Sequence, residues 1–325
     1  MILHERWFTD EAQFPVQFDR WSVPESWVPS AIAVGVTALV FAVWRAKGRR
    51  SPVPGPVQLG MTWENYEKVL SWVPLVIGLH MGVTLLVSGV SRQLFVPNLE
   101  LPVNLLGGVL GLAEIAIGLS FVYGALARPA AAVLGLLWLA GVVLFGPTRL
   151  IEHTEILGVA FFLFVTGRGA LAFDMAMERL HRPIPALIPY VVPVLRASAA
   201  IGIIVVAFTE KLWNLPMGLA FLAEHHFNFF PAIGLSGVDD TAFLIIAGTV
   251  ELTIGLILLS GAYVRLVILA TLIPFNLTLP FLGWRELVGH LTLYGIFALL
   301  LLWGDERPPE QGTLTSALEG DRSAT

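Results

Sequence analysis

The sequence predicts an all-α integral membrane protein with nine transmembrane helices, arranged as one N-terminal anchor followed by two parallel repeats of a four-helix bundle. Three observations predict this fold class. The composition is too apolar for a water-soluble domain, nine apolar runs alternate with polar residues, and the chain carries an internal repeat. A lipid bilayer is therefore the first partner expected for this protein.

The composition separates this chain from soluble proteins. Of its 325 residues, 56% are hydrophobic and 13% are charged, and the mean hydropathy is +0.78. Soluble domains average about 45–50% apolar and about 25% charged residues. The net charge is −5 and the cations are scattered, so nucleic acid is not expected as a partner. The chain has no cysteine, so any redox chemistry needs a bound cofactor or another subunit.

Nine apolar runs approach the length of about 20 residues that a spanning helix needs. They are 28–44, 70–90, 103–126, 130–145, 154–166, 191–208, 241–262, 265–282 and 287–303. They predict an N-terminal segment with one transmembrane anchor and a loop (1–68), a first bundle (69–174), a linker (175–190), a second bundle (191–304) and a disordered cytoplasmic tail (305–325). The first run is expected to be a retained anchor, because no small-residue cleavage site follows it.

The distribution of Lys and Arg predicts the orientation in the membrane. Cytoplasmic loops collect these residues. The first run is followed by a basic stretch at 45–50, and the loops on that side of the predicted membrane hold more Lys and Arg than those on the other side. We expect a multi-pass protein of a bacterial-type plasma membrane, with its N-terminus outside and its C-terminus in the cytoplasm.

The internal repeat has an offset of 137 residues. It pairs Gly111, Glu114, Gly118, Gly124, Arg128, Gly146, His153, Gly158 and Gly167 with Gly248, Glu251, Gly255, Gly261, Arg265, Gly283, His290, Gly295 and Gly304. Upstream the offset is 119, so the second copy carries 18 additional residues in an outer loop, where 223–231 is expected to form a short interfacial helix. An even number of spans separates the copies, so they are expected to be parallel.

Two glutamates at membrane depth are candidate functional residues. Glu114 and Glu251 occupy equivalent positions in the middle of apolar runs, where an ionisable group costs about 2.5–3.5 kcal/mol on insertion scales. Glycines three residues before and four residues after each glutamate would let another helix approach closely. The glutamates therefore either hold the helices together or, with a raised pKa, transfer protons or bind a neutral ligand.

His153 and His290 are the matching candidates on the last helix of each copy. We expect each histidine to converge with the glutamate of its own bundle, so that Glu114, His153, Glu251 and His290 form a proton relay or contact a ligand. A structural histidine at a helix start is the alternative. Haem held by both histidines is not expected, because they come from separate bundles. No residues are predicted to bind a metal.

A quinone is the cofactor that suits these groups, since imidazole can donate a hydrogen bond to a quinone carbonyl. Its expected contacts are Glu251, His290, Lys211 and His80. Lys211 follows Glu210 at the end of an apolar run, so a snorkelling pair is an alternative for it. His80 has no counterpart in the second copy and is equally open to a packing role.

The pattern Glu114-x3-Gly118-x5-Gly124-x3-Arg128, His153 on the last helix and the ending Gly167-Arg-Gly-Ala-Leu-Ala-Phe-Asp174 resemble the DoxX/DoxD-like integral membrane protein family of four-helix bundles. The second copy keeps the pattern but lacks the ending. The resemblance covers roughly residues 70–174 and 191–304, in tandem, whereas typical members are one bundle. It implies a membrane subunit of, or anchor for, a redox complex that meets quinone and needs partner subunits for activity.

Three functions therefore stay open at the level of the sequence. The first is the quinone-contacting redox subunit, the second is a scaffold or assembly protein without enzymatic activity, and the third is a small-solute or proton-coupled transporter. A lipid-facing cleft at the glutamates and histidines would favour the first. A sealed interior would favour the second, and a polar cavity open to one side would favour the third.

Overall fold

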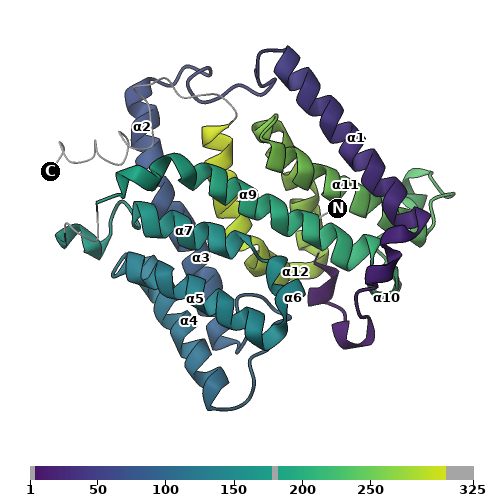
Figure 1. Ribbon diagram of the computed structural model, residues 1–325, viewed down its shortest axis with the longest axis horizontal. Helices are drawn as coiled ribbons and strands as arrows, with labels where there is room; N and C mark the ends of the chain where they lie inside the picture. The colour runs from purple at the N-terminus through teal and green to yellow at the C-terminus, as the bar shows by residue number, and fades with distance from the viewer. Residues whose placement is uncertain (1–3, 178–181, 305–325) are drawn as a thin grey trace.

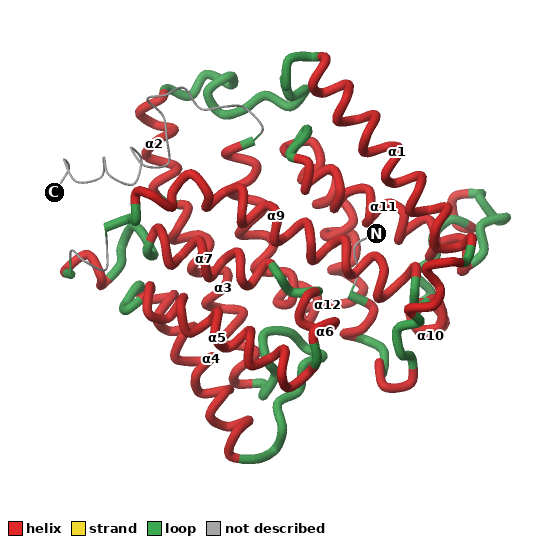
Figure 2. Tube along the Cα trace, in the orientation of Figure 1, coloured by secondary structure: helices red, strands yellow, loops and turns green. Residues whose placement is uncertain are grey.

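A computed structural model describes residues 4–177 and 182–304 of the chain, so the tail predicted at 305–325 lies outside the described residues. The described part is helical, with one isolated β-bridge between Gln93 and Glu100 (Figure 2). Its α-helices are α1 (Pro24–Ala46), α2 (Trp63–Ser71), α3 (Val73–Val90), α4 (Leu105–Tyr123), α5 (Ala127–Phe145), α6 (Pro147–Ile151), α7 (Glu155–Thr166), α9 (Ile188–Val206), α10 (Leu215–His225), α11 (Asp240–Ser260) and α12 (Val264–Trp303). The short η helices include η1 (Glu5–Trp7) and η6 (Ala207–Leu212), of which η6 is a π-helix.

Seven helices of the described residues are long and apolar enough to cross a membrane, which indicates a multi-pass membrane protein. Each of the nine apolar runs largely coincides with helical residues. Two runs share α12, which a non-helical Gly283 divides, and one run is the 12-residue α7. Two boundaries differ from expectation, since α2 starts inside the predicted first loop and α9 starts at Ile188, inside the predicted linker.

The backbone repeats with the same offset as the sequence. Left-handed or otherwise positive φ angles occur at Gly124, Leu126, Gly146 and Gly167, and again at Gly261, Tyr263, Gly283 and Gly304. Glycine adopts such angles at little cost because it has no Cβ atom. We name α3, α4, α5 and α7 the first unit, and α9, α11 and the two halves of α12 the second unit.

Arginine side chains close equivalent turns in both units, although they come from different helices. Arg168, in the segment after α7, donates to the carbonyl oxygens of Phe121 and Val122 at the end of α4. In the second unit Arg196 of α9 donates to the equivalent oxygens of Leu258 and Leu259 at the end of α11. Helix ends leave unpaired carbonyl groups that such donors satisfy. Arg196 thus replaces the ending that the second copy lacks.

Asp174, the last residue of the Gly-rich ending of the first copy, also makes structural contacts. Its carboxylate accepts hydrogen bonds from the backbone N–H groups of Leu126 and Ala127, at distances of 2.7 and 2.8 Å, where α5 begins. A carboxylate at a helix N-terminus satisfies unpaired N–H groups and suits the helix dipole. The Gly-rich ending of the first copy therefore serves structure.

The two units pack on each other reciprocally. Gly158 of α7 lies against Leu195 and Ser198 of α9, and the equivalent Gly295 of α12 lies against His80 of α3. The last helix of each unit thus packs on the first helix of the other, as in a two-fold dimer. Figure 1 shows α7 and α9 side by side, with α4 and α5 on one flank and α1 and α11 on the other.

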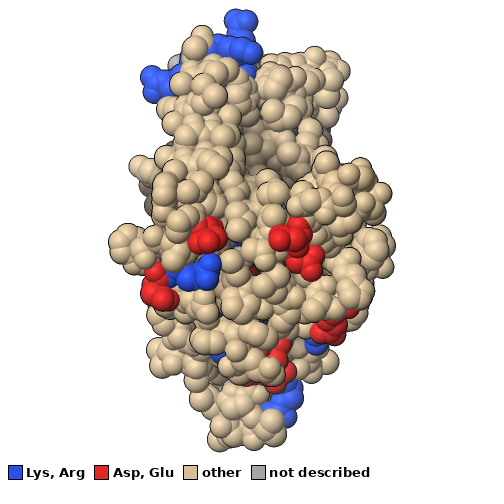
Figure 3. Space-filling model, turned by 90° about the vertical axis from the view of Figure 1, so that its right-hand side faces the viewer, with Lys and Arg blue, Asp and Glu red and all other residues tan. Residues whose placement is uncertain are grey.

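The surface is apolar where lipid is expected. α1 packs on α11 but leaves side chains such as Ile32 and Leu39 more than half exposed. Figure 3 shows one group of Lys and Arg side chains at the end of the molecule where α1 ends, then an uncharged band, and beyond the band Asp and Glu side chains together with further Lys and Arg side chains. These features suggest contact with a lipid bilayer.

The additional residues of the second copy form α10 and a loop. The helix expected at 223–231 lies earlier, because Pro216 stands in the first turn of α10 and His226, at φ 49°, ends it. The following segment exposes Phe229 and Ile233.

Gly283 provides a test of the break in α12. It has φ 69° and ψ −153°, a region open almost only to glycine, and an added Cβ would meet no atom within 4 Å. We expect Gly283→Ala to lower the free energy of unfolding in detergent by about 1–3 kcal/mol through backbone strain alone. The control is Gly135→Ala in α5, which also has open space and should be neutral or stabilising. Equal effects of both substitutions would refute the break as a backbone requirement.

Candidate functional site

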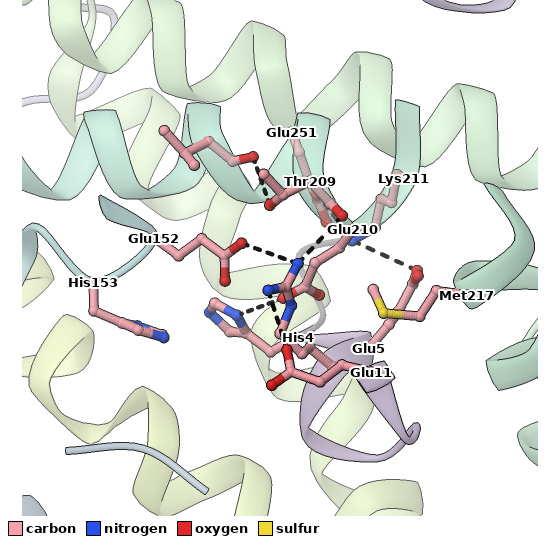
Figure 4. Close-up of polar contacts among 12 residues, drawn as sticks. His4, Glu5, Glu11, Glu152, His153, Thr209, Glu210, Lys211, Met217 and Glu251 are labelled. Atoms are coloured by element: carbon pink, nitrogen blue, oxygen red, sulfur yellow. Dashed lines mark hydrogen bonds and ion pairs between the residues drawn. The ribbon is translucent and has the colours of Figure 1, made fainter. Parts of the chain in front are cut away.

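The N-terminal segment supplies part of a buried ionic cluster between the two units. His4, Glu5, Arg6 and Trp7 are all buried, three of them in the single turn of η1. We call the following residues the central cluster: His4, Glu5, Arg6, Glu152, His153, Glu155, Glu210, Lys211, Glu251, Glu286 and His290. Figure 4 shows side chains from the N-terminal segment, the turn before α7, η6 and α11 pointing toward one another.

Arg6 joins the N-terminal segment to both units. Its guanidinium lies 3.1 Å from Glu11 and 3.2 Å from Glu152 of the first unit, and it donates to the carbonyl oxygen of Thr209 at 3.4 Å. A planar guanidinium presents five donors and serves several acceptors at once, which suits it to this position.

Lys211 is the second buried cation, and the π-helix η6 positions it. Its ammonium lies 3.1 Å from Glu251 of α11 and 3.6 Å from Glu5. The wide turn of η6 buries Thr209, Glu210 and Lys211 in succession, whereas an α-helix would distribute three consecutive residues around its circumference. Snorkelling does not describe Lys211, since the side chain is 1% exposed.

Three histidines meet at the centre of the cluster. The ring of His4 lies between the repeat-related histidines, with its centroid 5.5 Å from that of His153 and 5.2 Å from that of His290. It also stacks on Trp7 at 4.1 Å, and its Nδ1 lies 3.3 Å from Glu210. The Nε2 atoms of His153 and His290 are buried without a hydrogen-bond partner among the described residues. The histidines of the two copies are thus linked through His4.

The central cluster holds more acid than base. It contains six buried carboxyl groups against two permanent cations, Arg6 and Lys211. Uncompensated carboxylates in a low-dielectric interior are costly, so such groups take up protons instead. We therefore conclude that the cluster carries protons on some of its carboxyl or imidazole groups at neutral pH.

The pKa values of the groups outside the spanning helices agree with this conclusion. Burial raises the pKa of Glu5 to about 8, against the lowering effect of Lys211. Burial, followed by the charges of His153 and Lys211, lowers the pKa of His4 well below its usual value. Burial alone would lower the pKa of His153, but the hydrogen bond and charge of Glu155 outweigh it and raise that pKa.

The predicted site residues are only partly brought together. Glu251, Lys211 and His290 belong to the central cluster, and so does His153. Glu114 instead accepts a hydrogen bond of 2.6 Å from the backbone N–H of Phe95, and no contact among the described residues joins it to His153. The convergence expected within the first bundle is therefore not observed.

The two copies differ because their outer ends differ. Arg92, the counterpart of Lys211, is exposed and donates to the carbonyl oxygen of Pro102, so Glu114 has no cation equivalent to the one that Glu251 contacts. His80, the fourth expected quinone contact, lies against Gly295 with its Nδ1 2.7 Å from the carbonyl oxygen of Val76. Its position is that of a packing residue between α3 and α12.

Several cluster residues have no signature in the sequence. His4, Glu5 and Arg6 lie in a short leader without periodicity, and Glu152 and Glu210 belong to outer ends that differ between the copies. The only available signal is the concentration of three consecutive ionisable residues in a chain with 13% charged residues. Among the described residues, no group of three or more His, Asp or Glu is arranged to hold a metal ion.

A cavity of about 410 Å³ adjoins the cluster at Arg6. Residues of the N-terminal segment and of the α5–α6 region line it, including Glu11 and Arg149. The cavity therefore borders the buried guanidinium of Arg6.

Comparison with known proteins adds no relative: the chain matches no family model, no curated protein and no solved structure.

Lys211 tests the energetics of the cluster. Removing one partner of a buried ion pair typically costs about 3–5 kcal/mol, because the other charge is left buried. We expect Lys211→Met to lower the free energy of unfolding in detergent by that amount, and Glu251→Gln in the same chain to restore part of the loss. Lys68→Met is the matched control and should cost about 1 kcal/mol or less, since Lys68 and its partner Glu64 are exposed. Additive losses in the double variant would contradict the pairing.

Glu5 tests the protonation of the cluster. Its pKa is about 8 in the folded protein and 4.5 as the ordinary value, so between these pH values the folded state holds a proton that the unfolded state releases. The stability of the wild type relative to Glu5→Gln should therefore fall as the pH rises from about 4.5 to about 8, and level off above that. Unfolding midpoints of both proteins across this range measure it. A stability difference that is flat or rises with pH would show that Glu5 is ionised in the folded state.

Proposed function

We propose that this protein is a multi-pass membrane protein that takes up and passes protons through the central cluster. The observation that carries this proposal is the excess of buried carboxyl groups over buried cations, in contact with three histidines at the boundary of the two units. Such a cluster exchanges protons at little cost, because several of its groups compete for fewer protons than there are sites. The proposed topology has nine spans, with the N-terminus outside and the C-terminus in the cytoplasm of a bacterial-type cell.

His4 is the transfer group between the two halves of the relay. An imidazole can accept a proton on one nitrogen and release one from the other. Its ring contacts the histidine of each unit and its Nδ1 lies within 3.3 Å of Glu210. Protons arriving near Arg6 from the cavity would pass through Glu152, Glu210 and His4.

A redox complex that meets quinone is the first candidate for the process that consumes or supplies these protons. The resemblance to the DoxX/DoxD-like family supports it, since a membrane subunit that serves quinone must supply or accept protons. Glu251, Lys211 and His290 would bind the quinone head near the cluster. Without cysteine in the chain, a partner subunit would carry any sulfur or iron–sulfur chemistry.

Proton-coupled transport of a small solute is the second candidate, and the cavity favours it. The cavity is partly polar and reaches the surface beside Arg149, whose side chain is 36% exposed, whereas His153 and His290 are at most 2% exposed. A solute that bound beside Arg6 would change the charge next to the cluster and so its protonation.

The first experiment asks whether the cluster holds protons. We expect the infrared spectrum of the reconstituted protein at neutral pH to contain a protonated-carboxyl band that shifts in D₂O and fades as the pH is raised. Glu5→Gln and Glu210→Gln should each reduce the band, and Glu64→Gln, at an exposed position, should leave it unchanged. A spectrum without this band at neutral pH would reject the proposal.

A second experiment separates the settings. Native mass spectrometry of the protein in mild detergent would identify a bound quinone or a redox partner, which supports the redox setting. Proton uptake by vesicles that contain only this protein, driven by a solute gradient, supports transport. If neither occurs although the carboxyl band is present, the cluster holds protons for stability alone and the protein is a scaffold.

A further inference from the structure

The cavity beside the central cluster combines two arginines with an apolar wall. Its volume is about 410 Å³, within the range of small-molecule sites. Arg6, Glu11, Thr148 and Arg149 supply the polar part. The remaining lining is apolar or aromatic: Phe14, Pro15, Val16, Phe18, Leu144 and Phe145, with Gly146.

Glu11 already shows what the arginines recognise. Its two carboxylate oxygens lie 3.1 Å from a guanidinium nitrogen of Arg6 and 3.0 Å from one of Arg149. One carboxylate is thus held between two guanidinium groups, each through a charge-assisted contact to a different oxygen. Arg6 also lies 3.2 Å from Glu152, so Glu11 and Glu152 together balance the charges of the two arginines.

Arg6 and Arg149 are also available to a further acceptor. The Nε atom of Arg6 is buried and has no hydrogen-bond partner among the described residues. The Arg6 side chain as a whole is 5% exposed. Arg149 is 36% exposed and contacts Glu11 through its Nη2 atom. A ligand carboxylate that replaces that of Glu11 would therefore find donors on both arginines.

We infer that this cavity binds a small organic monocarboxylate whose apolar or aromatic body packs against Phe14, Phe18 and Phe145 while its carboxylate is held by Arg149 and Arg6. A monoanion that displaces the carboxylate of Glu11 keeps the charges balanced, and the apolar wall matches a body larger than a bare inorganic anion. The inference names a ligand class for the transport candidate. It does not depend on the relay, because binding is measured at equilibrium without a pH gradient.

The test is titration calorimetry of the reconstituted protein with phenylacetate, with phenylacetamide as the uncharged analogue and inorganic phosphate as the bare anion. We expect phenylacetate to bind and both controls to bind at least about tenfold more weakly, since a charge-assisted pair is lost in one and the apolar contact in the other. Equal binding of phenylacetate and phenylacetamide, or no binding of phenylacetate, would overturn the inference.

Two variants with opposite expected effects guard against misfolding as an explanation. Arg149→Gln, at a partly exposed position, should weaken phenylacetate binding about tenfold or more, and Glu11→Gln should strengthen it because a competing carboxylate is removed. Arg92→Gln removes the same charge from an exposed position outside the lining and should have no effect. Equal weakening by the Arg149 and Arg92 variants, or weakening by Glu11→Gln, would contradict the site.

The source of the ligand is tested with the same proteins. A monocarboxylate could enter from water or, as a fatty acid, from the bilayer. Native mass spectrometry that finds a fatty acid on the wild type but not on Arg149→Gln would support the site and assign it to the bilayer. Phenylacetate binding to protein that carries no fatty acid would support the site and assign it to the aqueous side.

Discussion

The reciprocal packing of the two units is the constraint on which the rest of the structure depends. Gly158 and Gly295 let the last helix of each unit approach the first helix of the other, and this places His153 and His290 at one boundary. Without it the two histidines would lie in separate bundles, as the repeat alone suggests. A close helix contact through small residues is a common way to associate helices in a bilayer, where no hydrophobic effect drives helices together.

The N-terminal segment then breaks the symmetry of this arrangement. It contributes one ring between the repeated histidines and one cation, Arg6, that contacts acidic residues around it. Burying ions costs desolvation free energy that their attraction only partly returns, so a buried cluster of this size is weak evidence for a role in stability. The proposed proton exchange would account for the excess of carboxyl groups, because it requires groups that can hold a proton in one state and release it in another.

The two copies place their equivalent glutamates in different surroundings. Glu114 satisfies a backbone N–H group in the loop after α3, which is a structural role, while Glu251 contacts Lys211 in the central cluster. The same sequence pattern therefore has two outcomes. The difference comes from Arg92 and Lys211, which are equivalent in the repeat but end up exposed and buried respectively.

The sequence by itself determined the helical class, the positions of the apolar helices, the repeat with its glycine-rich breaks, and four members of the cluster, because apolar periodicity and paired identities are local properties of the chain. Only the tertiary structure decided that Glu114 is separate from His153, that Arg196 replaces the missing ending of the second copy, and that His4, Glu5 and Arg6 complete the site. These contacts join residues up to 286 positions apart, as His4 and His290 are, and no local pattern encodes which distant surfaces meet. Packing between the units and the entry of the N-terminal segment determine them.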